Sequence, residues 1–119
     1  MSTPFPTDLK LHQQSRKLEV SFDDGSVFEL PCEYLRVYSP SAEVRGHGPD
    51  QAVLQVGKEN VNITAIEPVG NYAVKLVFDD GHDSGLYSWS YLHELGSRRE
   101  EYWARYLEAL AAAGHERRG

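Results

Sequence analysis

The chain has 119 residues, of which 40% are hydrophobic and 25% are charged. This composition is typical of a globular domain, and the length suffices for one hydrophobic core. The formal net charge of −6 disfavours nucleic acid and anionic membranes as main partners, because both attract basic surfaces. No apolar run approaches the roughly 18 residues of a membrane-spanning helix, and the N-terminus lacks a signal-peptide pattern. We therefore expect a cytoplasmic protein.

Cysteine content limits the chemistry that this chain can perform. The single cysteine, Cys32, excludes an internal disulfide and cannot form a multi-thiolate zinc or iron–sulfur site by itself. Cys32 follows Pro31 at the start of a predicted helix, where a thiol pKa can fall. Its apolar neighbours Leu30 and Leu35 favour the other interpretation, a packed and unreactive thiol.

The first predicted elements are strands. Residues 1–7 form an extended, flexible lead that contains two prolines. Leu9 and Leu11 alternate with polar residues and indicate a first strand. Residues 18–22 show the same alternation of apolar and polar side chains, which is typical of a half-buried strand.

A hairpin and a short helix follow. Asp24-Gly25 predicts a two-residue type I′ turn, which needs positive φ at both central positions. The return strand covers residues 27–30. Pro31 suits the first turn of a helix, where its missing N–H has no cost. We expect this helix over residues 32–38, ended by Ser39-Pro40 because a residue before proline avoids the α region.

The segment 39–51 is the least regular part of the sequence between its predicted elements. Long irregular loops in compact domains are often functional. His47 lies between two glycines, whose backbone N–H groups can form an anion-binding concavity, and Arg36 and Arg45 can supply positive charge nearby. The alternative is a glycine-rich turn without a ligand.

Strands and a helix are predicted again in the second half of the chain. The further strands cover residues 53–56, 61–69, 72–78 and 85–87. Ser88 is the predicted N-cap of a helix over residues 89–95, and Gly96 ends that helix.

A last helix closes the predicted domain. Ser97 and Glu100 form its capping box. Its apolar residues recur at spacings of three and four: Tyr102, Trp103, Tyr106, Leu107, Leu110 and Ala111. We expect this stripe to lie against the sheet. Residues 114–119, which begin with a helix-ending glycine, form a disordered tail.

The sequence also contains an internal repeat. Phe22-Asp23-Asp24-Gly25 and Phe78-Asp79-Asp80-Gly81 are identical, and a strand and a Tyr-Leu pair follow each of them. The repeat predicts two hairpin-plus-helix halves. The fold class is therefore α+β, a twisted antiparallel sheet of five to six strands with two to three helices packed on one face. We expect one domain over residues 8–113.

His82 is the histidine with the strongest candidate role. It follows the turn glycine Gly81 and precedes Asp83, so it resembles a metal ligand oriented by a carboxylate. The alternative is a hydrogen bond inside its own turn. No His-Glu-x-x-His zinc pattern, P-loop or Gly-x-Gly-x-x-Gly is present. The aromatic residues of the C-terminal third can bind a quaternary ammonium ion through their ring faces or, alternatively, pack in the core.

The order of several motifs resembles one known family. These motifs are Phe22-Asp23-Asp24-Gly25, Leu30-Pro31, Tyr34-Leu35-Arg36-Val37, Ser39-Pro40-Ser41-Ala42-Glu43-Val44, Gly46-His47-Gly48, Ile66-Glu67-Pro68-Val69-Gly70 and Asp80-Gly81-His82-Asp83-Ser84-Gly85-Leu86-Tyr87-Ser88-Trp89. Together they resemble the small bacterial proteins of the gamma-butyrobetaine-hydroxylase-like N-terminal domain family, a domain of unknown function. The resemblance covers about residues 7–110.

The resemblance carries an expectation about metal. In the carnitine-pathway hydroxylases, this domain precedes an oxygenase domain and holds a structural zinc, through three clustered cysteines after a Leu-Arg pair and a histidine near a later Asp-Gly turn. Here no cysteine follows Leu35-Arg36, and only His82 matches a ligand position. A closed tetrahedral site needs four ligands, so no cofactor is expected. Similar domains are also attached to P-loop iron–sulfur carrier proteins, which suggests a role beside cluster handling.

These observations lead to one leading hypothesis and two alternatives. We expect a non-catalytic binding or adaptor module with a protein partner, whose binding residues are Arg36, Arg45, His47, His82 and Asp83. The first alternative is a zinc- or iron-binding or iron–sulfur accessory protein that uses His82. The second alternative, an enzyme, requires a paired nucleophile and base in a cleft, and no such constellation is evident in the sequence.

Overall fold

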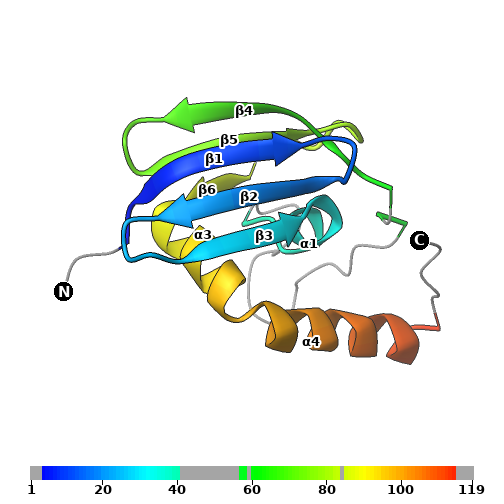
Figure 1. Ribbon diagram of the computed structural model, residues 1–119. Coiled ribbons are helices and arrows are strands. Elements are labelled where there is room, and N and C mark those ends of the chain that lie inside the picture. Colours follow the sequence, from blue (N-terminus) through cyan, green and yellow to red (C-terminus); the bar gives the residue numbers. More distant parts are fainter. Residues whose placement is uncertain (1–3, 41–56, 59, 84, 115–119) are drawn as a thin grey trace.

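The computed structural model describes residues 4–40, 57–58, 60–83 and 85–114, and their six strands form two antiparallel sheets (Figure 1). The first sheet has the order β1 (Pro6–His12), β2 (Lys17–Phe22), β3 (Val27–Pro31), and the second has the order β4 (Ile63–Val69), β5 (Ala73–Phe78), β6 (Leu86–Ser88). The helices are α1 (Cys32–Val37), α3 (Trp89–Ser97) and α4 (Arg99–Ala112). The α+β class is therefore confirmed.

The predicted single sheet of five to six strands is replaced by two sheets of three strands. Each sheet is a run of consecutive hairpins, and described strands pair only within their own half of the chain. The two sheets are joined by a shared hydrophobic core instead of by a strand ladder. Strand alternation in the sequence specifies which side chains are buried, but it does not specify which strands pair across the halves. The predicted strand 53–56 lies outside the described residues.

The two halves have the same βββα architecture. Pro6 pairs with Phe22 in the first half and Ile63 with Phe78 in the second, and in both halves a register shift follows this pair directly. The threonine beside it repeats as well, because Thr7 Oγ1 donates to the backbone of β2 and the corresponding threonine of β4 donates to β5. The repeat is therefore longer than predicted. Each unit contains three strands and one helix, not only a hairpin and a helix.

The two Phe-Asp-Asp-Gly turns have the same hydrogen bonds. Phe22 N donates to Ser26 O at 2.8 Å, and Phe78 N donates to His82 O at 2.9 Å. The φ angle is +89° at Gly25 and +90° at the matching glycine, whereas the preceding aspartates have ordinary negative values. The predicted two-residue type I′ turn is therefore wrong. Each hairpin has a three-residue loop instead. The glycine is its last residue and has the positive φ that the G1 bulge of such loops requires.

Reciprocal hydrogen bonds connect the helices of the two halves. Tyr34 of α1 donates its hydroxyl to Leu95 O at 2.7 Å, and the corresponding Tyr91 of α3 donates to Tyr38 O at 2.5 Å. The acceptors are also equivalent positions in the repeat. The two halves therefore face each other with an approximate two-fold relation.

The core lies between the two sheets, α1 and α3. Leu18, Val20 and Phe22 are buried as their alternation predicted. In α1 all six residues are buried, including the charged Glu33 and Arg36. Each large apolar side chain in such a core contributes roughly 1.5–3 kcal/mol to folding.

The junction of α3 and α4 differs from the prediction. Ser88 caps α3 as expected, since its Oγ accepts from Tyr91 N at 3.2 Å. Gly96 does not end this helix, which continues to Ser97. A Cβ atom at Gly96 would lie 2.3 Å from the ring of Phe28, so this glycine is needed for close packing. Ser97 forms no capping box, because its Oγ donates back to Glu94 O and Arg98 is the N-cap of α4.

Helix α4 packs against α1 and not against a sheet. Tyr106 and Leu110 are buried in a small cluster with Val37 of α1, while Leu107 of the predicted stripe is 39% exposed. Figure 1 shows α4 extending past the edge of the first sheet. The helix ends at Ala112, close to the predicted glycine. Within the described residues, none of the helices is long and apolar enough to cross a bilayer.

Candidate functional site

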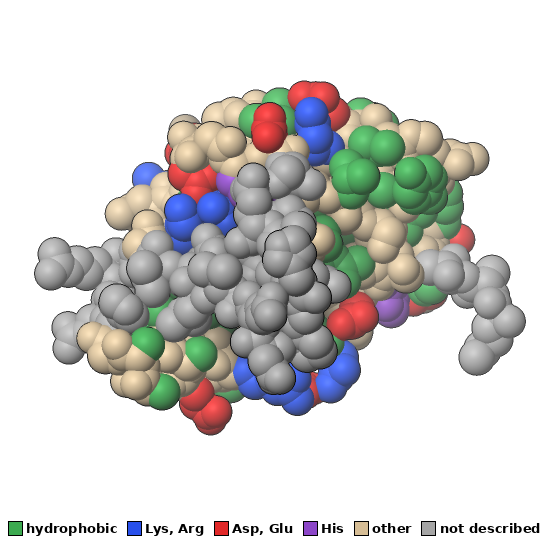
Figure 2. Space-filling model, turned by 180° about the vertical axis from the view of Figure 1, so that it is seen from behind, with side chains coloured by type: hydrophobic (Ala, Val, Ile, Leu, Met, Phe, Trp, Pro, Cys, Tyr) green, Lys and Arg blue, Asp and Glu red, His purple; other side chains and the backbone are tan. Residues whose placement is uncertain are grey.

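The β5–β6 turn carries a carboxylate that two cations share. Asp80 Oδ1 accepts from the backbone N–H of His82 at 3.1 Å, which is a hydrogen bond inside the turn. Its Oδ2 accepts from Arg36 Nε at 2.9 Å and from Lys58 Nζ at 2.8 Å. On the face shown in Figure 2, basic side chains lie beside acidic side chains and a histidine.

A buried serine–histidine pair lies next to this carboxylate. Ser39 follows α1 and is 0% exposed, and His82 of the turn is 5% exposed. Ser39 Oγ and His82 Nε2 are 2.8 Å apart and form a hydrogen bond. We call the set Arg36, Ser39, Lys58, Asp80 and His82 the turn cluster.

Arg36 is the most deeply buried charged group of the turn cluster. Its side chain is 9% exposed. Among the side chains that the structure describes, its Nη1 is a buried nitrogen without a hydrogen-bond partner. A buried unsatisfied donor costs about 1–3 kcal/mol, and more when the group is charged. The guanidinium is therefore incompletely satisfied by the described residues.

The cations determine the charge state of Asp80. Burial alone would raise the pKa of this carboxyl group. Hydrogen bonds from Lys58, the His82 backbone and Arg36 outweigh burial and lower the pKa to about 2. Asp80 is therefore ionised at neutral pH, and two cations minus one carboxylate leave a formal charge of +1 on these three groups.

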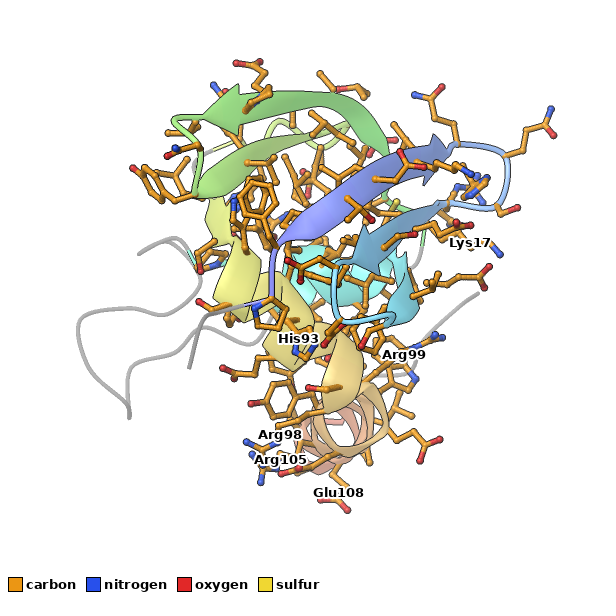
Figure 3. The ribbon with its side chains drawn as sticks, turned by 60° about the vertical axis from the view of Figure 1, so that its left-hand side comes forward. Lys17, His93, Arg98, Arg99, Arg105 and Glu108 are labelled. Carbon is orange, nitrogen blue, oxygen red and sulfur yellow. The ribbon has the colours of Figure 1, made fainter. Side chains whose placement is uncertain are left out.

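The equivalent turn of the first half holds its aspartate in a related way. Asp24 Oδ1 accepts from Ser26 N at 2.9 Å, and Asp24 Oδ2 lies 2.9 Å from His93 Nε2. Figure 3 shows His93 on α3 beside this turn. His93 occupies the position in α3 that Arg36 occupies in α1. Each turn aspartate is thus paired with the helix of the opposite half.

The two sites differ in what fills the space around that pair. In the first half, the His93 ring lies edge-on to Phe22 and Phe28, with centroids 5.0 and 5.4 Å apart. The Phe28 ring rests on Gly96 of the opposite helix. The first half therefore fills this space with aromatic rings.

In the second half, the corresponding contact is between Gly85 and Ser39. A Cβ atom at Gly85 would lie 2.3 Å from Ser39 Oγ, so the residue before β6 packs closely on the segment that follows α1. Here the glycine precedes β6, and the side chain that it meets is the polar Ser39, bonded to His82. Buried polar groups cost free energy unless they are fully bonded, so the aromatic solution is the simpler one for stability. The turn cluster is therefore the candidate functional site.

The predicted binding residues fall into three groups. The structure brings Arg36 and His82 into one cluster. Asp83 is exposed, beside the cluster in sequence. Arg45 and His47 lie outside the described residues.

Three members of the turn cluster were missed by the sequence analysis. Asp80 carried a usable signal, because it belongs to the repeated turn motif. Ser39 was interpreted only as the end of a helix. Lys58 lies in a segment without periodicity, and nothing in the sequence connects it to a turn 22 residues away.

Within the described residues, no three potential metal-binding side chains lie close enough together to hold an ion. His82 Nε2 is bonded to Ser39, which lies in the stretch where the resemblance places zinc-binding cysteines. Burial raises the pKa of Cys32 to about 11, and its Sγ contacts Asn62 Oδ1 at 3.7 Å. Cys32 is thus the packed thiol that its neighbours favoured.

The Ser39–His82 pair has the distance of a nucleophile and its base. Because Ser39 is fully buried, its hydroxyl acts in this structure as an internal hydrogen-bond partner. Several aromatic side chains of the C-terminal third pack in or against the core, namely Trp89, Tyr91, Tyr102 and Trp103. The Tyr102 hydroxyl also donates to Glu94 Oε2 at 2.5 Å.

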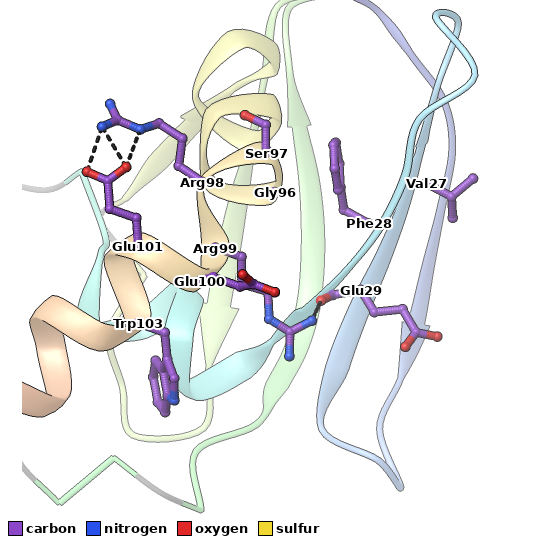
Figure 4. Close-up of a pocket in the computed structure, with 10 residues that line it drawn as sticks. All are labelled: Val27, Phe28, Glu29, Gly96, Ser97, Arg98, Arg99, Glu100, Glu101 and Trp103. Carbon is purple, nitrogen blue, oxygen red and sulfur yellow. Dashed lines mark hydrogen bonds and ion pairs between the residues drawn. The ribbon is translucent and has the colours of Figure 1, made fainter.

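A groove of about 830 Å³ lies between β3 and the α3–α4 junction (Figure 4). Both of its arginines already have partners. Arg98 forms ion-pair hydrogen bonds with Glu101, and Arg99 Nη1 donates to Glu29 O at 2.7 Å. This groove therefore lacks the unsatisfied buried donor that marks the turn cluster.

Comparison with known proteins places the chain among domains of unknown function. A family model described as gamma-butyrobetaine hydroxylase-like, N-terminal, matches residues 9–93. No curated protein matches the chain.

Solved structures that are similar to this one include the following three. An NMR solution structure is 61% identical, with a TM-score of 0.83, over 98% of this chain and 86% of that chain. A second NMR solution structure is 50% identical, with a TM-score of 0.84, over 98% of this chain and 91% of that chain. A crystal structure of a DUF971 family protein of unknown function from Acidithiobacillus ferrooxidans is 37% identical, with a TM-score of 0.65, over 76% of this chain and 91% of that chain.

Proposed function

This chain belongs to the family described as gamma-butyrobetaine hydroxylase-like, N-terminal, and we propose that it is a non-catalytic binding module for another protein. Its working surface is the turn cluster. We also include Arg45 and His47 among the proposed binding residues, as in the sequence analysis, although both lie outside the described residues.

The difference between the two halves is the observation that carries the proposal. The same architecture occurs twice. The first half shows that the space around its turn aspartate can be filled by Phe28, Gly96 and a histidine. The second half replaces this packing by a buried arginine, serine and histidine. Such departures from the simplest stable solution are expected at functional sites.

The chemistry of the cluster favours binding over catalysis. Its serine is buried, its aspartate is held ionised between two cations, and its histidine is bonded to the serine. Fixed charges and hydrogen-bond donors supply recognition. A protein partner is favoured over nucleic acid because the formal net charge of the chain is −6.

Affinity capture with symmetric variants tests this proposal. The cluster variant carries Lys58→Ala with Asp80→Asn, in which the asparagine oxygen still accepts from the turn backbone. The matched control carries Asp24→Asn with His93→Ala, the equivalent pair of the first half. Both variants are first checked for folding by circular dichroism and thermal melting.

The proposal predicts that the wild type and the control capture the same partner from native cells, whereas the cluster variant loses it. Calorimetry with that purified partner then measures the affinity of each variant directly. Equal affinity of the cluster variant and the control would show that the turn cluster is not the working surface. A third variant with Arg45→Ala and His47→Ala tests the loop separately.

A further inference from the structure

We infer that the turn cluster receives one carboxylate group, held jointly by Arg36 and Lys58. This inference rests on the proposed binding function and specifies the chemical group that the partner presents. The carboxylate comes from a glutamate or aspartate side chain or from a C-terminus, and these sources share the same recognition chemistry.

The unsatisfied nitrogen of Arg36 is the first reason. Arg36 Nε is bonded to Asp80, but Nη1 has no acceptor among the described residues although it is buried. A guanidinium has only donors, so the missing group must be an acceptor. Because the side chain is 9% exposed, an acceptor that reaches it replaces little water and gains a charge-assisted hydrogen bond.

The local charge is the second reason. Arg36 and Lys58 carry two positive charges, and Asp80 offsets one of them. A single carboxylate neutralises the remainder. A phosphate monoester carries about 1.5–2 negative charges at pH 7 and would leave an excess beside the ionised Asp80. The planar guanidinium also matches the planar geometry of a carboxylate.

The cluster is accessible from the side of Lys58 and Asp80. The Lys58 side chain is 22% exposed and the Asp80 side chain is 21% exposed. A carboxylate that arrives there contacts the lysine first and the more deeply buried guanidinium afterwards. The two aspartates of the repeat differ in their partners, because Asp80 is bonded to two cations whereas Asp24 is bonded to a histidine packed against two phenylalanines.

NMR titration with acetate tests the inference on the intact chain. The ¹H–¹⁵N signal of Arg36 Nε is assigned by its loss in Arg36→Lys and is followed as sodium acetate replaces sodium chloride at constant ionic strength. The inference predicts a saturable shift with acetate in the millimolar range and none with acetamide. Phosphate binds more weakly than acetate. The absence of a saturable acetate shift, or tighter binding of phosphate, would overturn it.

A matched pair of lysine variants distinguishes a local effect of Lys58 from a general effect of charge. Lys58→Met removes the exposed cation and is expected to weaken acetate binding about tenfold, the equivalent of one charge-assisted hydrogen bond. Lys75→Met removes a lysine of β5 that pairs with Glu67 outside the cluster and should leave acetate binding unchanged. Equal effects of the two variants would show a general charge effect and contradict the inference.

Two short peptides identify the source of the carboxylate. One carries a glutamate between blocked termini, and the other has a free C-terminus and no acidic side chain. The peptide that reproduces the acetate shift identifies the source, and failure of both would contradict the inference. If partner capture depends on the turn cluster while acetate has no effect, the binding function stands and the carboxylate assignment falls.

Discussion

The two halves of this protein share a βββα architecture and differ in what fills the space around the turn aspartate. Strand pairing, the register shift, the turn hydrogen bonds and the tyrosine bonds between helices all occur twice. Around the turn aspartate, the first half has aromatic rings and the second half has the turn cluster. The first half is thus an internal control. Features present in both halves serve the fold, and features present in one half need a further explanation.

The largest expected effects concern the shared scaffold. Phe22 and Phe78 are equivalent, and their exposed fractions are 4% and 2%. We expect Phe22→Ala and Phe78→Ala each to lower the free energy of unfolding by about 3–5 kcal/mol, the usual range for a buried phenylalanine. Urea denaturation measures both values. A loss below about 1 kcal/mol in only one half would break the equivalence of the halves.

The helix glycine tests the aromatic packing of the first half. In Gly96→Ala the new methyl group meets the ring of Phe28, and overpacking of this kind costs about 1–3 kcal/mol. A smaller side chain in Phe28→Leu should recover part of this loss in the double variant. A double-mutant cycle gives the coupling, and strictly additive effects would show that the two residues do not constrain each other.

The tyrosines of the two helices provide a symmetric pair of smaller effects. Tyr34→Phe and Tyr91→Phe each remove one hydrogen bond to the opposite helix. We expect each to cost about 1 kcal/mol, with the larger loss at the fully buried Tyr34. The melting temperatures of both variants, compared with that of the wild type, measure these losses. An unchanged melting temperature in either would show that its bond adds nothing to the fold.

Acid should distinguish the two turn aspartates. Asp80 has its pKa lowered from 3.8 to about 2, so it stabilises the fold above pH 3.8 and this contribution is lost as the pH falls towards 2. Asp80→Asn should therefore flatten the decline of stability in this window. Asp24→Asn should change it less, because Asp24 is exposed and hydrogen bonds from Ser26, rather than cations, mainly lower its pKa. Equal pH profiles of the two variants would contradict this difference.

Chelation should have the smallest effect. The described core closes through apolar side chains of both sheets and the helices. We therefore expect untagged protein to keep its melting temperature after treatment with a chelator. A large drop would mean that a metal ion stabilises the fold, and would favour the alternative of a metal site at His82.

Local parts of this fold were predictable because they depend on neighbouring residues. The alternation of Leu18 and Val20 placed them in the core, Pro31 marked the start of α1, and Ser88 marked the start of α3. The repeated turn motif also revealed the two halves. In each case the physical cause lies within a few residues of its effect.

The incorrect predictions concern contacts between distant residues. Gly96 was interpreted as a helix end, whereas its role depends on Phe28, far away in the sequence. The stripe of α4 was assigned to a sheet, because a periodic pattern predicts a buried face without identifying what covers it. Lys58 was missed because its partner, Asp80, is 22 residues away in the sequence.

A charge-free version of the turn cluster tests most directly whether it is retained for binding and not for stability. The variant combines Arg36→Met, Lys58→Met and Asp80→Asn, which keeps the volumes and the turn acceptor. Replacement of buried charges by apolar groups of similar size is often neutral or stabilising. We predict a free energy of unfolding within about 1 kcal/mol of wild type, together with loss of partner binding. A loss of several kcal/mol with partner binding retained would show instead that the cluster is structural.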